Sequence, residues 1–284
     1  MNNTSSKEIK EVISWLSEQS LRNVSKWSEI TEPLNNDIWT SAEKSLDFIT
    51  NRANYLKAAQ LLPWDVILSQ INSNSIVLDL GCGMGWLSAM LSVKESIEKI
   101  ICVDSDANML ETSLPDMFRL MSGNIEKVQL VCGLFEPILL ESSSVDLIVA
   151  SSSFHHSDNL FELLKECRRV LKRNGILVIL GENPINKMDF IISYLRISIK
   201  IIINLFVGTV QEKTQQISGI GILYDPVLGD WNYSRDAWYA AIKDAGFRLF
   251  EIDSRLHPYS YRYDKMTIKH FICYLSDDFI IPQA

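Results

Sequence analysis

The sequence predicts an α/β protein with a seven-stranded, mostly parallel sheet covered by helices on both faces. Three observations predict it. A short apolar run at 76–80 leads through a glycine-rich turn into a helix, strands and helices alternate from 76 to 182, and a helix followed by two strands fills 234–275. Such alternation is typical of parallel strands joined by helical crossovers. An N-terminal helical layer and a helical and loop insertion before the last strands complete the predicted architecture.

Residues 1–75 are expected to form a mostly helical N-terminal cap. Ser5 or Ser6 could cap a helix over 7–22, and a second helix is predicted from about 40 to 61. Tryptophans are concentrated here, and we expect them to pack this layer onto the sheet. The alternative is that one or two of them line a substrate pocket, where aromatic faces bind flat or cationic groups. These residues are Trp15, Trp27, Trp39 and Trp64.

The stretch 76–86, Ile-Val-Leu-Asp-Leu-Gly-Cys-Gly-Met-Gly-Trp, predicts a ligand cradle. Its apolar start suits a buried parallel strand. Its three glycines allow a tight turn in which backbone N–H groups lie against a ligand. The spacing of 84–93 is helical, so the positive end of a helix faces the same place.

The spacing of the glycines indicates which ligand the turn suits. Dinucleotide-binding turns read G-x-G-x-x-G and hold a pyrophosphate. Here Gly81, Gly83 and Gly85 read G-x-G-x-G, and Trp86 stands where the third dinucleotide glycine would be. Asp79, two residues before the first glycine, would repel a pyrophosphate and attract a cation. The turn therefore predicts a cationic ligand and argues against NAD.

The pattern hh-D-h-G-x-G-x-G resembles motif I of the class I S-adenosylmethionine (SAM) methyltransferases, whose fold is Rossmann-like. The resemblance implies that Asp79 helps to hold the methionine end of SAM. It implies that the glycine turn, with Cys82 and Trp86, lies against the amino acid and ribose. It also implies S-adenosylhomocysteine as the product.

A second acid follows at the end of the next predicted strand, 99–103. Asp104 lies about 20 residues past the glycine turn, where an acid can accept both ribose hydroxyls. The alternative is that Asp104 caps the next helix. Residues 103–110, Val-Asp-Ser-Asp-Ala-Asn-Met-Leu, resemble the family's V-D-x-S-x-x-M-L segment. This resemblance adds Ser105 to the cofactor contacts and places Met109 near the adenine.

The third predicted strand, 127–131, departs from the family pattern. Family members usually carry G-D-A after it, with the Asp accepting from the adenine amino group. This chain reads Gly133-Leu134-Phe135. We therefore expect the adenine to be held by apolar contact and by backbone N–H groups of these residues.

Residues 144–156, Ser-Val-Asp-Leu-Ile-Val-Ala-Ser-Ser-Ser-Phe-His-His, resemble the family's fourth strand. A helix over 160–171 and a strand over 172–180 follow, and the latter resembles R-V-L-K-x-G-G-x-L. The resemblance covers roughly 70–182, so we assign 76–182 as the SAM-binding core. At the end of the fourth strand we expect Ser151 to contact the cofactor and Phe154 the substrate.

Three histidines are candidates for a catalytic base. His155 and His156 follow the fourth strand and can exchange protons near neutral pH, and His257 is a weaker candidate by position. The alternative is a structural histidine bonded to a backbone carbonyl, which we prefer for His156.

Residues 183–233 are predicted to be a lid or substrate insertion. The stretch 188–207 is apolar enough to suggest a membrane span, but its polar residues fall on one helical stripe, which predicts an amphipathic helix. We favour a lid, with a homodimer contact and a membrane-surface contact as alternatives. In the following glycine-rich stretch Tyr224, Trp231 and Tyr233 are expected substrate contacts.

Residues 234–284 are predicted to complete the core sheet. Ser234 suits the N-cap of a helix over 237–245 that Gly246 ends. The segment Ala-Gly-Phe at 245–247 resembles the family's entry to its sixth strand. The segments 248–253 and 267–275 are the expected closing strands, the last one antiparallel.

Composition limits the partners and the compartment. The formal net charge is −8 at pH 7 with a pI of about 5.1, which argues against nucleic acid as the substrate. The start of the sequence carries no signal-peptide pattern, so we expect a cytoplasmic protein. The five cysteines have no C-x-x-C pairing, so we expect buried thiols and neither zinc sites nor disulfides.

These observations predict a SAM-dependent methyltransferase that acts on a small-molecule acceptor, with oxygen as the preferred atom. Holding both reactants in line can lower the barrier by about 7–11 kcal/mol. The fourth strand is followed by Ser-Ser-Ser-Phe, neither N/D-P-P-Y/F nor the acid of Mg²⁺-dependent catechol enzymes. We therefore expect no metal and no methylation of nucleobase or amide nitrogen, and without a Pro-Cys nucleophile no cytosine C5 chemistry. The alternatives are a non-catalytic SAM-binding protein and a membrane-surface enzyme for a lipid or quinone.

Overall fold

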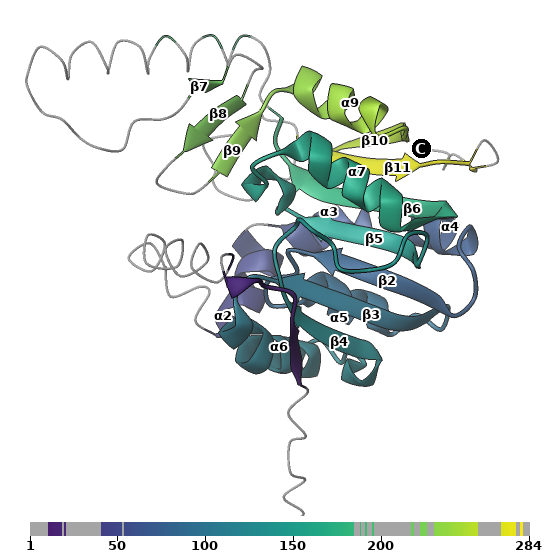
Figure 1. Ribbon diagram of the computed structural model, residues 1–284. Helices are drawn as coiled ribbons and strands as arrows, with labels where there is room; N and C mark the ends of the chain where they lie inside the picture. Colours follow the sequence, from purple (N-terminus) through teal and green to yellow (C-terminus); the bar gives the residue numbers. More distant parts are fainter. Residues whose placement is uncertain are drawn as a thin grey trace, which may run out of the picture.

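A computed structural model describes residues 11–18, 20, 41–52, 54–184, 188, 191, 195, 217–218, 222–225, 230–254, 268–276 and 279–280. Its centre is an eight-stranded sheet in the order β1-β4-β3-β2-β5-β6-β11-β10 (Figure 1). The strands are β1 (Val12–Ser14), β2 (Ser75–Leu80), β3 (Ile97–Asp104), β4 (Val128–Cys132), β5 (Val145–Ser151), β6 (Leu171–Glu182), β10 (Arg248–Ser254) and β11 (Ile268–Tyr274).

Strands β1 to β6 of this sheet run parallel, and β11 runs antiparallel between β6 and β10. The parallel strands are buried runs of Val, Ile and Leu, as expected where helices cover both faces. The predicted fold class, with its antiparallel last strand, is confirmed.

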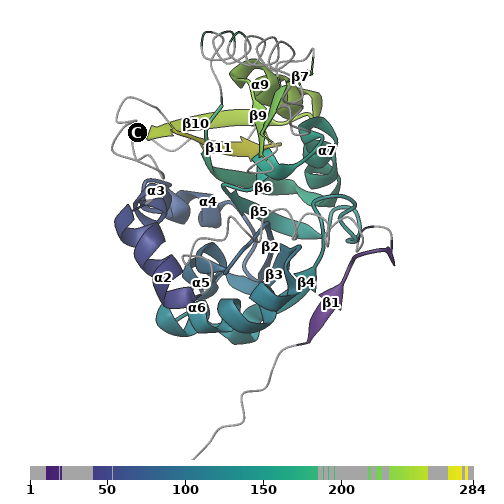
Figure 2. The same cartoon turned by 90° about the vertical axis from the view of Figure 1, so that its left-hand side faces the viewer.

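Helices lie on both faces of the sheet (Figure 2). α7 and α9 pack on one face, and α3, α4, α5 and α6 pack on the other. The helices are α2 (Ala42–Asp47), η3 (Phe48–Arg52), α3 (Tyr55–Gln60), α4 (Trp64–Ser69), α5 (Trp86–Ser92), η4 (Met109–Ser113), α6 (Leu114–Leu120), η5 (Ile125–Lys127), η6 (Phe154–His156), α7 (Leu160–Val170) and α9 (Arg235–Asp244).

Alternation along each strand divides the core into two layers. On β2, Leu78 and Leu80 pack with α7 and α9, whereas Val77 packs with α4, α5 and α6. All three side chains are fully buried. Burial of such a side chain contributes about 1.5–3 kcal/mol to folding stability. Packing on both faces of the sheet therefore holds the strand ends in fixed positions.

The N-terminal segment differs from the prediction. Residues 12–14 form strand β1 in place of part of the helix expected over 7–22, and this makes eight strands where we expect seven. The segment pairs with Leu130–Cys132 of β4, and the Trp15 N–H donates to the Cys132 carbonyl at 2.8 Å. An unpaired edge of β4 favours such pairing over an isolated helix. Residues 1–10 and 21–40 of the expected cap, with Trp27 and Trp39, lie outside the described residues.

The helix predicted over 40–61 is divided into shorter pieces. Ser41 caps α2 by accepting the Lys44 N–H at 3.3 Å, and Asn54, at φ 56°, interrupts the helix between η3 and α3. Trp64 is buried, and its indole N–H donates to the Ala59 carbonyl at 2.9 Å. Trp64 therefore packs this layer on the sheet, which is the first of the two roles considered for the tryptophans.

The insertion ends in a small antiparallel sheet where we expect only loops. It consists of β7 (Ile217–Ser218), β8 (Ile222–Asp225) and β9 (Asp230–Tyr233) (Figure 1). Strand β9 lies against η6. Cross-strand pairing of β8 with β9 overrides the glycine-rich local sequence. Of the amphipathic helix predicted over 188–207, all but Met188, Ile191 and Leu195 lies outside the described residues, and these three side chains are exposed.

Among the residues that the structure covers, no helix has the length and apolar character needed to cross a bilayer.

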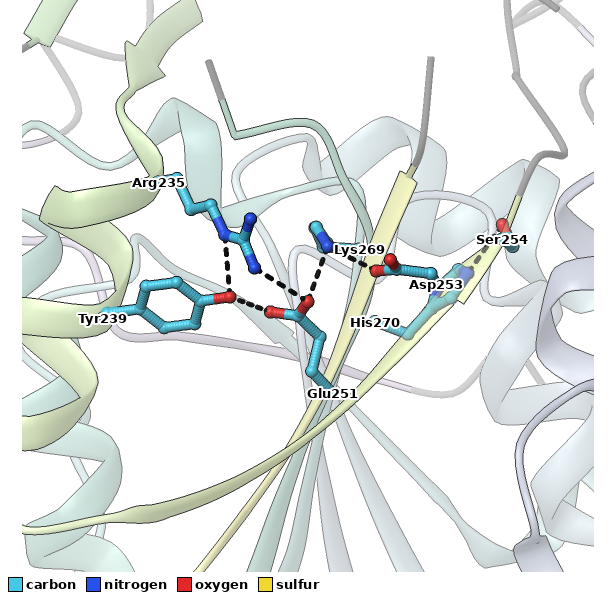
Figure 3. A network of polar contacts seen from close by, with 7 residues as sticks. All are labelled: Arg235, Tyr239, Glu251, Asp253, Ser254, Lys269 and His270. Atoms are coloured by element: carbon cyan, nitrogen blue, oxygen red, sulfur yellow. Dashed lines mark hydrogen bonds and ion pairs between the residues drawn. The ribbon is translucent and has the colours of Figure 1, made fainter. Parts of the chain in front are cut away.

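The C-terminal helix and its neighbouring strands follow the prediction. Ser234 accepts the Ala237 N–H at 3.1 Å and begins α9, and Gly246, at φ 82°, follows its end. A polar network then joins α9 to β10 and β11 (Figure 3). Arg235 and Tyr239 reach Glu251, Lys269 lies between Glu251 and Asp253, and His270 contacts Ser254.

Candidate cofactor site and active site

The bend after β2 is held in a conformation that glycine favours. Gly81, Gly83 and Gly85 have φ of 69°, 52° and 75°. The N–H groups of Gly81 and Cys82 donate to the Val103 carbonyl at 2.9 and 3.0 Å, which ties the bend to the end of β3. This left-handed conformation is unfavourable for L-residues, so glycine is the default there.

The three glycines face different surroundings. A Cβ on Gly81 would lie 2.6 Å from the Ser153 Cβ, and one on Gly85 would lie 2.8 Å from the Leu114 Cγ. A Cβ on Gly83 would meet no atom within 4 Å. The outer glycines therefore allow close packing of the bend, whereas Gly83 borders open space where a ligand can reach the backbone.

Asp104 binds the bend directly. Its Oδ2 accepts the Gly83 N–H at 2.8 Å, and its Oδ1 accepts the Asp106 N–H at 3.0 Å. Burial raises the pKa of Asp104, and these two backbone N–H groups oppose that rise. A carboxylate has about four acceptor positions, so both oxygens keep capacity for ribose hydroxyls. The local turn bond to Asp106 coexists with the link to the bend, so capping is not the sole role of Asp104.

Asp79 lies beneath the bend. Its carboxylate is 1% exposed, and its Oδ2 accepts the Ser88 hydroxyl of α5 at 2.6 Å. Burial raises the pKa of Asp79 to about 7, the Ser88 hydrogen bond opposes the rise, and the charge of Asp104 adds to it. A positively charged ligand would lower that pKa again, because it favours the ionised form.

Trp86 packs against the N-terminal helices. Its ring stacks on Tyr55 of α3 with centroids 6.4 Å apart and planes 15° apart, and it packs against the apolar cluster that Tyr55 forms with Phe48 and Ile49. Cys82 is buried, with its Sγ 3.6 Å from the Gly83 carbonyl. Both residues support the bend from the protein side.

The ends of β3 and β4 meet beside the bend. The Gly133 N–H donates to the Asp104 carbonyl at 2.9 Å, and the Cys132 thiol lies 3.5 Å from the Ser105 carbonyl. Phe135 stands edge-to-face on Phe154 at 5.9 Å. Further residues expected at the cofactor are half-buried at the same edge of the sheet: Ser105, Met109, Leu134, Phe135 and Ser151.

The segment after β5 is fixed by polar contacts. The Ser153 hydroxyl donates to the Leu80 carbonyl at 2.9 Å, next to Gly81. Phe154, an expected substrate contact, is fully buried in the core, and its N–H donates to Glu182 Oε1 at 3.1 Å. This placement indicates a packing role for the Phe154 ring.

His155 has a carboxylate partner that sequence reasoning missed. Its Nδ1 lies 3.0 Å from Oε2 of Glu182, whose side chain is 2% exposed. The ring centroids of His155 and His156 are 4.3 Å apart, and the charge of His156 is one of the influences that hold down the pKa of Asp104 against its burial. In the sequence, Glu182 could have been noticed as the charged residue that follows the apolar run 176–180.

The other residues expected to contact the substrate lie in different environments. Tyr233 is buried, and its hydroxyl donates to the Ser157 carbonyl at 2.6 Å and accepts the Leu160 N–H at 3.2 Å, which is a structural bridge. The Trp231 indole donates to Asp158 Oδ1 at 2.8 Å, beside η6. The Tyr224 side chain and His257 lie outside the described residues.

All five cysteines are free and buried, as expected. In the described part of the chain, no three His, Cys, Asp or Glu side chains are grouped closely enough to hold a metal ion.

Comparisons with known proteins place the core in one family. Residues 78–179 match the family model described as "Methyltransferase domain". Demethylmenaquinone methyltransferase of Thermotoga maritima is 34% identical over 114 residues, which are 40% of this chain and 46% of that protein. Malonyl-acyl-carrier-protein O-methyltransferase of Priestia megaterium is 28% identical over 107 residues, which are 38% of this chain and 36% of that protein. The chain thus matches less than half of the length of these relatives.

A solved structure shares the fold. Geranyl diphosphate C-methyltransferase of Streptomyces coelicolor, solved with Mg²⁺, geranyl-S-thiolodiphosphate and S-adenosylhomocysteine, has a TM-score of 0.53 at 15% identity. The match covers 78% of this chain and 76% of that one. By the matched family model, residues 78–179 are a methyltransferase domain, and the bend between two aspartates makes this core similar to the class I SAM-dependent methyltransferases.

Proposed function

We propose that the protein transfers a methyl group from SAM to a small-molecule acceptor, with oxygen as the preferred acceptor atom. One observation carries the proposal. Asp104 binds the N–H of Gly83, the bend glycine whose Cβ position is open. A nucleoside placed across Gly83 would have its ribose hydroxyls next to the Asp104 carboxylate.

The charges beneath the bend suit a sulfonium nucleoside. Asp79 is a buried acid with its pKa near 7, and its carboxylate accepts the Ser88 hydroxyl. A cationic ligand would stabilise its ionised form. SAM supplies an electrophilic methyl group when it is bound. The chain holds the reacting groups in line from rigid strand ends, and we expect this positioning to contribute most of the rate enhancement.

The acceptor side is proposed to lie beside η6 and β9, the described end of the insertion 183–233. β9 packs against η6, and Trp231 reaches Asp158 next to that turn. η6 carries His155 and His156 at the edge where ligands of parallel sheets bind. The demethylmenaquinone and malonyl-acyl-carrier-protein enzymes are named for acceptors other than nucleic acid, and the net charge of −8 favours a similar class here.

Calorimetric titration with SAM and S-adenosylhomocysteine tests the proposal. We expect the wild type to bind both and Asp104→Asn to bind about 100-fold more weakly, because hydrogen bonds to a charged group contribute about 1.5–3 kcal/mol each. Asp106→Asn is the matched control, since Asp106 is exposed and caps Met109 at 2.9 Å. No binding by the wild type, or equal binding by Asp104→Asn, would remove the basis of the proposal.

One residue favours a second candidate, a SAM-binding protein that transfers nothing. Leu134 stands where family members carry the adenine-binding acid. Formation of S-adenosylhomocysteine in the presence of cell-extract acceptors separates the two. Tight binding without turnover in every extract would favour the second.

A further inference from the structure

We propose that Glu182 fixes the tautomer of His155, so that this histidine takes a proton from the acceptor. The acceptor is then a neutral hydroxyl compound such as a phenol or an enol, and not a carboxylate. The inference deepens the proposed methyl transfer and rests on it.

Glu182 is a buried carboxylate with a partner on each oxygen. Its Oε1 lies 3.1 Å from the Phe154 nitrogen and its Oε2 lies 3.0 Å from His155 Nδ1. A buried carboxylate costs several kcal/mol unless donors satisfy it, which assigns both neighbours the role of donor. Glu182 therefore requires a hydrogen on Nδ1 of His155.

The end of β6 holds Glu182 in position. Glu182 pairs with Lys269 of β11 in the sheet. The neighbouring Gly181 donates its N–H to His270 Nδ1 at 3.1 Å, and its carbonyl accepts the Ser152 hydroxyl at 3.0 Å. Burial lowers the pKa of His270 to about 4, so its ring is neutral at pH 7 and can accept this N–H. Figure 3 shows His270 beside Ser254, its second partner, at the edge of the sheet.

The tautomer decides where the basic lone pair lies. A neutral imidazole carries one hydrogen, and with that hydrogen on Nδ1 the lone pair is on Nε2. An acid that orients a histidine through Nδ1 is the arrangement that prepares a histidine base in hydrolytic triads. Glu182 is therefore a positioning residue, and His155 is the base.

The pair formed by His155 and Glu182 lies on the same edge of the sheet as the glycine bend. His155 follows Ser153 by two residues, and Ser153 is the residue that a Cβ on Gly81 would meet at 2.6 Å. The His155 side chain is 27% exposed, so a ligand can reach it. Its neighbour His156 acts electrostatically on Asp104. The base and the proposed ribose acid therefore border one region.

With a hydroxyl acceptor, the O–H hydrogen passes to His155 Nε2, and the oxygen electron pair forms the bond to the methyl carbon. The electron pair of the broken C–S bond remains on sulfur. His155 becomes an imidazolium that Glu182 stabilises at 3.0 Å, and it returns the proton to water.

This chemistry selects the acceptor class. A phenol has a pKa of about 10 and keeps its proton at pH 7, so a positioned base contributes about 10²–10⁴-fold in rate. A carboxylate acceptor, with a pKa of about 4, is already ionised and gains nothing from a base. A built histidine–carboxylate pair therefore indicates an acceptor that must lose a proton.

The first test reads the tautomer without any acceptor. ¹⁵N NMR of ring-labelled histidine distinguishes Nδ1–H from Nε2–H, and the chain has four histidines, so His155→Gln assigns the signal. We expect Nδ1–H in the wild type. In Glu182→Gln the amide oxygen can still accept the Phe154 N–H, while its NH₂ group donates to His155 Nδ1, so we expect Nε2–H. Glu162→Gln, the same change on the exposed side of α7, should leave the tautomer unchanged.

The second test uses methyl-labelled SAM and cell-extract acceptors. We expect Glu182→Gln to lower the rate of labelling about 10²–10⁴-fold, with SAM affinity and the rate of Glu162→Gln near those of the wild type. The labelled product should resist mild alkali, as a methyl ether does, whereas a methyl ester would release methanol.

Nε2–H at His155 of the wild type, or an alkali-labile product, would overturn the inference. Failure to bind SAM or to label any extract would instead count against the proposed transfer, and the tautomer result would still decide the role of Glu182.

Discussion

Gly83→Ala should remain folded, with a modest loss of unfolding free energy, and bind SAM about ten- to a hundred-fold more weakly. The new methyl group would meet no protein atom within 4 Å, so the stability cost is that of an L-residue at φ 52°, about 1–2 kcal/mol. The methyl group would occupy the space assigned to the nucleoside. Urea unfolding and calorimetry on one preparation measure both effects.

Gly85→Ala is the matched control for this prediction. Its Cβ would lie 2.8 Å from the Leu114 Cγ and 3.2 Å from Phe118 Cε2, inside the packed core. We expect an additional loss of about 1–3 kcal/mol in unfolding free energy from overpacking. If Gly83→Ala binds SAM as tightly as the wild type, the nucleoside does not lie against Gly83.

SAM binding should release a proton from Asp79 and weaken as the pH falls below 7. Burial holds the pKa of this acid at about 7 in the unliganded protein, against 3.8 in water, and the cationic ligand lowers it. Below pH 7 the acid must lose its proton before it can pair with the cation, so affinity falls about tenfold per pH unit, or roughly 50-fold from pH 7 to pH 5. Calorimetry in buffers of different ionisation enthalpy measures the released proton.

Two variants isolate this effect. Asp79→Asn should remove the Asp79-linked proton release and that part of the pH dependence, while Ser88→Ala should move the dependence to higher pH, since the Ser88 hydroxyl stabilises the carboxylate at 2.6 Å. The raised pKa of Asp79 also makes the folding stability depend on pH. Because the folded protein holds the Asp79 proton longer than the unfolded chain, the unliganded protein should lose stability as pH rises from about 4 to 7, by at most about 1.4 kcal/mol per unit. Unchanged affinity from pH 5 to pH 7 would contradict a contact between Asp79 and the cation.

Local patterns in the sequence were sufficient for the bend and for α9. The strand, glycines and helix of 76–92 are contiguous, and the two acids follow from their spacing to the glycines. Ser234 and Gly246 bound α9 because cap residues act within one turn. In each case the determining contacts lie close together in the chain.

Contacts between distant segments were not predictable in this way. β1 forms because residues 12–14 meet the open edge of β4, more than one hundred residues away in sequence. Glu182 reaches His155 because β5 and β6 are parallel neighbours, so their carboxyl ends coincide. Phe154 and Tyr233 carry the aromatic character expected of a pocket, but their burial depends on packing that the local sequence does not show.

The structure of the complex with S-adenosylhomocysteine would show directly whether the nucleoside binds at the glycine bend. We expect the adenosine to lie across Gly83, with its ribose hydroxyls hydrogen-bonded to the Asp104 carboxylate and its amino acid end on the side of Asp79. A nucleoside bound away from Gly83, with neither aspartate near it, would show that the bend is not the cofactor site.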